Sequence, residues 1–138
     1  MAIKRDPILT CFFLCDRVIR DDITKKWGAI GLFNALVADS FPVGYFEMWF
    51  FCRFADAPAE IDMRNSITDP DGKVIAECSR HFSIGSLPEA GSIGAGRGWW
   101  EIGGRFKDIV FQRPGQYRVH VNINQIELGD SALYLAQA

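Results

Sequence analysis

Apolar and polar residues alternate with a period of two through most of this 138-residue chain. Successive side chains of a β-strand point to opposite faces, so this period is typical of strands. No window shows the 3.6-residue period of an amphipathic helix, and only residues 16–26 leave room for a single helical turn. The pattern therefore predicts an all-β protein.

Turn-forming residues divide the chain into short runs. Residues 69–72 (Asp-Pro-Asp-Gly) and Pro114-Gly115 favour turns, and Gly103-Gly104 favours a bulge inside a strand. Seven of the eleven residues 16–26 are charged, which predicts a solvated connection. The expected strands are residues 8–15, 29–37, 45–54, 61–68, 73–82, 99–111 and 117–123, and the short runs 126–128 and 133–135 close the chain.

About seven or eight strands separated by turns favour an antiparallel β-sandwich of the immunoglobulin-like type, with a β-barrel as the alternative. Tyr117, three residues after Pro114, resembles the corner tyrosine of such sandwiches, whose hydroxyl bonds to nearby backbone. The runs at 8–15 and 29–37 are continuously apolar, which predicts strands covered on both faces.

The composition is that of one globular domain spanning residues 1–138. Apolar residues make up 49% and charged residues 23%, and a chain of this length buries enough surface for one core. A net charge of −2 argues against a generic nucleic-acid surface. No apolar run reaches the roughly 18–20 residues that span a bilayer. Neither nucleic acid nor a membrane is an expected partner.

The four cysteines are expected to be free thiols in a cytoplasmic protein. Cys11 and Cys15 lie four positions apart on one strand, which separates their Cα atoms by roughly 13 Å. A disulfide needs less than about 7 Å. A domain of this size also needs no disulfide to be stable.

No catalytic residue, metal or cofactor is expected from the residue pattern. Cys78 and His81 lie three apart on a strand and face opposite ways, so they cannot form a nucleophile–base pair. His120 falls on the polar face of its strand and is expected to be solvated. Residues 69–72 lack the flanking ligands of a calcium loop, and no zinc spacing exists.

The glycine-rich residues 83–98 are expected to form a long loop, and Arg97 within it could contact a small anion. Trp99 and Trp100 must face opposite ways on the strand that follows, so one of them is a candidate to stack on a sugar or anchor a protein. These residues support the alternative hypothesis of a ligand-binding or enzymatic domain.

The strand at 45–54 carries the main candidate surface. Its wholly apolar face is expected in the core and consists of Phe46, Met48, Phe50, Cys52 and Phe54. Its other face exposes Tyr45, Trp49 and Phe51, residue types that are common at interfaces. This predicts a homodimer or higher oligomer, or another protein partner. The competing account is that residues 16–26 or the long loop cover the same face from within.

Six short motifs together resemble a family of small uncharacterised bacterial proteins, catalogued as a domain of unknown function. The motifs are Leu14-Cys15-Asp16-Arg17, Gly31-Leu32-Phe33, Phe41-Pro42, Arg53-Phe54, Asp69-Pro70-Asp71-Gly72 and Pro114-Gly115-x-Tyr117. The resemblance implies a bacterial source and a β-sandwich-like fold, and it implies no activity. The leading hypothesis is therefore a non-enzymatic module for protein interaction or self-association.

Overall fold

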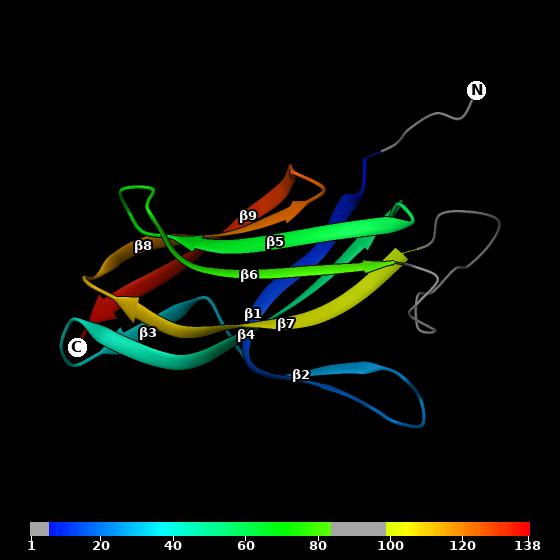
Figure 1. The fold of residues 1–138 in the computed structure, drawn as a ribbon. Helices are drawn as coiled ribbons and strands as arrows, with labels where there is room; N and C mark the ends of the chain where they lie inside the picture. The colour runs from blue at the N-terminus through cyan, green and yellow to red at the C-terminus, as the bar shows by residue number, and fades with distance from the viewer. Residues whose placement is uncertain (1–5, 84–98) are drawn as a thin grey trace.

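The chain folds as two packed β-sheets with nine strands among its described residues (Figure 1). The computed structural model describes residues 6–83 and 99–138. From edge to edge, the four-stranded sheet consists of β2 (Trp27–Phe33), β1 (Ile8–Arg20), β4 (Val43–Ala55) and β7 (Trp99–Phe111). The five-stranded sheet consists of β3 (Ala35–Ala38), β9 (Ile126–Gln137), β8 (Gly115–Ile123), β5 (Glu60–Thr68) and β6 (Val74–Ser83).

The predicted all-β sandwich is confirmed. Every strand pair is antiparallel except β3 with β9. One of the two sheets is curled like half of a barrel, and the immunoglobulin-like arrangement is not confirmed. The helical turn considered within 16–26 is wrong, because those residues complete β1 and a tight turn before β2. The described part of the chain holds no helix of the length and apolarity that a membrane span requires.

The main core lies between the two sheets. Strands β4, β5, β7 and β8 supply most of its fully buried side chains, such as Phe50, Phe106 and Ile67. Tyr117 is 1% exposed, packs edge-on against Phe111, and donates its hydroxyl hydrogen to the Arg113 carbonyl oxygen at 2.7 Å. The corner-tyrosine prediction is therefore confirmed.

The expected strand at 29–37 is in fact two strands. β2 belongs to the four-stranded sheet, and after Asn34 the chain crosses to the other sheet as β3. In contrast, the two short strands expected at 126–128 and 133–135 form one continuous strand, β9. A single segment, residues 27–38, thus forms the edge of both sheets on the same side of the sandwich.

Near the start of β4 and the end of β7, the positions that face the core shift by one residue. One residue that was expected in the core is exposed as a result. Phe50 and Phe54 face inward, but further toward the start of β4 the inward position passes to Tyr45, and Phe46 is 76% exposed. Opposite Phe46, Asp108 of β7 has a positive φ of 52°. The placement of Phe46 in the core was wrong, because the paired distortion reverses the alternation at this point.

The expected bulge at Gly103-Gly104 is also wrong, because both glycines keep regular register with Phe51 and Phe50 of β4. Their role is close packing. A Cβ on Gly103 would lie 2.7 Å from a methyl carbon of Val18, and one on Gly104 would lie 2.9 Å from a ring carbon of Phe50. Real Cβ atoms essentially never approach so closely, so both faces of β7 require glycine here.

The β1–β2 hairpin forms a partial third layer. In Figure 1 it projects from the sandwich alongside the four-stranded sheet. Its Val18 lies over Gly103, and the Trp27 ring packs edge-on against Phe51 with 6.0 Å between ring centroids. A second, smaller core results on the outer face of this sheet, with Cys15, Val18 and Phe51 buried in it. Coverage of the apolar run at 8–15 on both faces is thus confirmed only toward its end, where Leu14 and Cys15 are buried, whereas Ile8 is 57% exposed.

Candidate functional site

The structure does not bring Tyr45, Trp49 and Phe51 together on an exposed face. Tyr45 packs against the main core and contacts Phe111 edge-on at 5.7 Å. Phe51 is 5% exposed beneath the β1–β2 hairpin, whereas Trp49 is half-buried at the margin of the same cluster. The predicted exposed aromatic face was therefore wrong, because Tyr45 faces the core and the β1–β2 hairpin, with Val18 from residues 16–26, covers Phe51.

Of the other residues predicted to contact a ligand or partner, one is buried in the core and two have side chains outside the described part of the structure. Trp100 is 2% exposed and stacks between Phe54 and Phe82, so it belongs to the core. Arg97 lies outside the described residues. Trp99 begins β7, but its side chain also lies outside what the structure describes. The expectation that one of the two tryptophans binds a ligand now applies to Trp99 alone.

The side of the sandwich formed by residues 27–38 differs from every other edge. We call this segment the β2–β3 edge; it contains no charged residue. It exposes Ile30 by 56%, Leu32 by 64% and Val37 by 66%. Within the described residues, β2 pairs only with β1, so its other backbone edge is open.

The opposite edge strands are protected in the usual way. β6 carries Glu77 and Arg80, and β7 carries Arg105, Lys107 and the distorted Asp108. Charges and backbone irregularities on an edge strand discourage pairing with another chain. The β2–β3 edge keeps one such irregularity, at Gly31, where φ is 72° and a Cβ would collide with the Asp16 carboxylate of β1. It lacks the charges.

A second feature is a depression of about 400 Å³ where β6 and β7 meet, which we call the seam notch. Arg80 of β6 crosses to β7 and donates a hydrogen bond to the Gly103 carbonyl oxygen at 3.3 Å. The Arg105 guanidinium lies 5.5 Å from the centre of the Trp49 ring and pairs with Glu47 at 2.9 Å. Lys107 completes the cationic lining.

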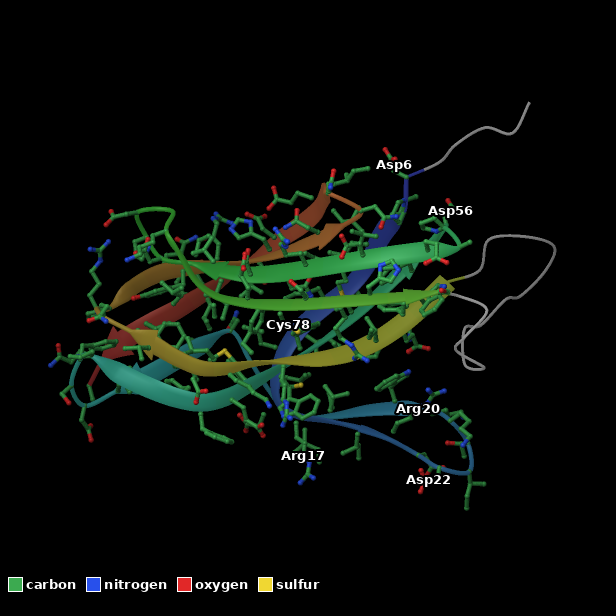
Figure 2. All side chains as sticks on the ribbon, viewed as in Figure 1. Asp6, Arg17, Arg20, Asp22, Asp56 and Cys78 are labelled. Atoms are coloured by element: carbon green, nitrogen blue, oxygen red, sulfur yellow. The ribbon has the colours of Figure 1, made fainter. Side chains whose placement is uncertain are left out.

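Hydrogen bonds fix the wall of the seam notch. The Trp49 indole N–H donates to Glu47 at 3.2 Å, and this bond, with the Arg105 hydrogen bond and the charges of Arg105 and Lys107, lowers the pKa of that carboxyl. Cys78 also lines the notch, and Figure 2 places it at the seam between the sheets. Burial raises the pKa of its thiol, so Cys78 is protonated at neutral pH.

The four thiols are free, as predicted. Burial raises the pKa of Cys52 to about 12 and also raises the pKa of Cys15. A thiol held protonated by its apolar surroundings is a poor nucleophile. Cys15, Cys52 and Cys78 therefore have structural rather than catalytic surroundings.

A third feature crosses the outer face of the five-stranded sheet. His120 was expected to be solvated, yet its side chain is only 21% exposed and both ring nitrogens are engaged. Nε2 lies 2.9 Å from the Thr68 hydroxyl oxygen, and Nδ1 bonds to the Glu127 carboxylate. A shallow pocket of about 520 Å³ opens beside Thr68 and His120.

A hydroxyl, an imidazole and a carboxylate in series can activate the hydroxyl as a nucleophile. Acyl transfer also needs hydrogen-bond donors aimed at the developing oxyanion. Thr68 instead lies within the sheet, in register with Val74 and Arg118, and Arg118 is paired with Asp130. The array therefore ties β5, β8 and β9 together.

Sequence reasoning missed the seam notch and the His120 array because their members come from different strands. The β2–β3 edge was visible in the sequence as a twelve-residue stretch without charge. No group of three metal-binding side chains occurs within residues 6–83 and 99–138.

Comparison with known proteins gives a family and no activity. Residues 10–136 match the model described as "Family of unknown function (DUF6941)". No curated protein matches the chain. Among solved structures, the chain is similar to the Pseudomonas fluorescens alkylpurine DNA glycosylase AlkC bound to DNA containing an abasic site analog, with 15% identity and a TM-score of 0.48. The match covers 94% of this chain and 30% of that one.

A second similar structure is a glycosyl hydrolase family 2 member from Bacteroides cellulosilyticus DSM 14838, with 10% identity and a TM-score of 0.45. That match covers 65% of this chain and 12% of the hydrolase. The chain thus spans less than a third of either protein. Similarities at this level say nothing about activity.

Proposed function

We propose that this chain, which belongs to the DUF6941 family of unknown function, is a non-enzymatic β-sandwich module that self-associates through its β2–β3 edge. The observation that carries the proposal is the twelve-residue segment 27–38, which has no charge although it forms the edge of both sheets. A bacterial source and a cytoplasmic location belong to the same proposal. They are supported by the motif resemblance and the four free thiols.

The proposed contact is antiparallel pairing of β2 with β2 of a second copy. An open strand edge presents unpaired N–H and C=O groups, which another strand can satisfy. Two identical antiparallel edges are complementary to each other about a twofold axis. Leu32 of each copy would then lose water-exposed apolar surface, and no charged side chain of either β2 strand would be buried.

The side chains that flank Leu32 also support a second copy of this chain as the partner. Ile30 is exposed beside Leu32 on β2, and Val37 continues the apolar strip onto β3. Interfaces of this kind are depleted in charged residues at their centre. The positive φ of Gly31 interrupts the extended backbone of β2 and limits the length of regular pairing, so we expect a weak dimer with a micromolar dissociation constant rather than a permanent one.

Sedimentation velocity between 1 and 200 μM tests the proposal. We expect the weight-average mass to rise above the monomer value of 15.5 kDa with concentration. Leu32→Lys places a charge at the centre of the proposed contact and should keep the protein monomeric throughout. Val74→Lys is the matched control, because Val74 is 47% exposed on the opposite edge strand β6 and should leave association unchanged.

Two results would overturn the proposal. One is a wild-type protein that stays monomeric up to 200 μM. The other is association that Leu32→Lys leaves intact while Val74→Lys abolishes it, which would move the contact to the β6–β7 side. Equal thermal unfolding of both variants would show that neither result reflects misfolding.

A further inference from the structure

The seam notch joins the two sheets at the side opposite the β2–β3 edge. β6 and β7 are edge strands of different sheets, and they run side by side there (Figure 1). The notch has room for a small molecule, at about 400 Å³. Gly103 and Gly104 bring no side chain into it, and their neighbours Val18 and Phe50 leave no space for one.

The lining is strongly cationic in a chain whose net charge is −2. Arg80, Arg105 and Lys107 all line the notch. Glu47 is the carboxylate that pairs with Arg105 and feels the charge of Lys107. These four groups leave a surplus of two positive charges, and Arg80 has no carboxylate partner among the described residues.

Both arginines are held in place before any ligand arrives. One guanidinium N–H of Arg80 is bound to the Gly103 carbonyl oxygen, which leaves its other N–H groups available. Arg105 is fixed between the Trp49 ring and the Glu47 carboxylate. Pre-ordered donors lose little conformational entropy on binding, which favours affinity.

Arginine recognises oxygen anions with paired N–H donors, and phosphate oxygens fit this geometry well. A dianion matches the surplus of two positive charges. The Trp49 ring adds an apolar wall beside them, suited to the organic part of a ligand. We infer that the seam notch binds a small phosphate monoester through Arg80, Arg105 and Lys107, with Trp49 beside its organic portion.

Isothermal titration of the full chain with three probes tests this inference. The probes are glucose 6-phosphate, inorganic phosphate and glucose. We expect the monoester to bind with a dissociation constant of tens to hundreds of micromolar and several-fold more tightly than inorganic phosphate, and we expect glucose not to bind. Equal binding of phosphate and monoester would overturn the monoester assignment, and absence of binding by both would overturn the site.

Charge-neutralising variants then locate the site. Arg80→Gln and Lys107→Gln should each weaken binding about tenfold or more, the usual effect of losing a charge-assisted contact. Arg64→Gln is the matched control, because Arg64 is exposed on β5 outside the notch and its loss changes net charge equally. Equal weakening in all three variants would show nonspecific attraction and overturn the site.

A spectroscopic readout is independent of affinity. Bound ligand should change the fluorescence of Trp49, and this change should vanish in Trp49→Phe while the chain still binds. A ligand-induced change that persists in Trp49→Phe would place binding elsewhere. The monomeric Leu32→Lys variant should bind the monoester like the wild type, so failure of the self-association proposal and failure of this one can be told apart.

Discussion

Replacing Gly104 by alanine tests the close packing on which the four-stranded sheet depends. The new Cβ would lie 2.9 and 3.1 Å from two ring carbons of Phe50. Phe50 is fully buried, and its ring contacts Phe106 and Phe12 with centroid separations of 5.3 and 6.1 Å. The ring can therefore move away from the new methyl group only by displacing other side chains of the core.

Overpacking a filled core costs about 1–3 kcal/mol. The alanine itself returns about 0.5–1 kcal/mol, because glycine loses more backbone entropy than alanine on folding. We expect Gly104→Ala to lower the free energy of unfolding by about 1–2 kcal/mol, measured by urea denaturation with tryptophan fluorescence. For a chain of this length the melting temperature should fall by about 3–8 °C.

Gly44→Ala is the matched control on the neighbouring strand β4. A Cβ there would meet only the Ile109 carbonyl oxygen at an ordinary 3.8 Å. The control should be neutral or slightly stabilising. Phe50→Leu should cost less stability in the Gly104→Ala background than in the wild type, because the smaller side chain relieves the clash. Equal stability of Gly104→Ala and Gly44→Ala would refute the packing argument.

Two further predictions concern a buried amide and a carboxylate. Asn65 is fully buried and its side-chain oxygen has no hydrogen-bond partner among the described residues, so Asn65→Leu should raise the free energy of unfolding by about 1 kcal/mol in the same urea assay. A loss of stability would show that the amide has an essential partner. The lowered pKa of Glu47 implies that its contribution to stability is present at neutral pH and is lost as pH falls through the folded-state value. The fluorescence of Trp49 should therefore titrate with a midpoint below the ordinary glutamate value of 4.5, and Glu47→Gln should abolish that titration.

Local signals predicted most of the fold. The alternation that defines β5 and β8 arises because each strand has one face on the core, and a single strand is enough to display it. The Tyr117 corner was predictable for the same reason, since its ring and its Arg113 partner lie four residues apart. Features that form within one strand and its adjoining turn can be predicted, because the residues that make them are close together in the sequence.

Features made by two strands together were not predictable in this way. Phe46 continues the apolar alternation of its strand, and only the paired irregularity at Asp108 turns it outward. The seam notch likewise combines Arg80 and Arg105, which come from edges of different sheets. The spacing of residues within one strand cannot indicate that two side chains from different sheets will lie close together.

For the β2 strand, the sequence predicts more burial than the single chain shows. Its continuous apolar character predicted burial on both faces, and yet Ile30 and Leu32 are each more than half exposed in the single chain. Both side chains stand on the strand at the edge of the four-stranded sheet, where β1 is the only neighbouring strand among the described residues. An edge that natural proteins usually protect with charge is here left without any. Pairing with a second copy would give β2 a central position in an eight-stranded sheet, and its cross-strand neighbours would then cover part of the exposed surface of Ile30 and Leu32.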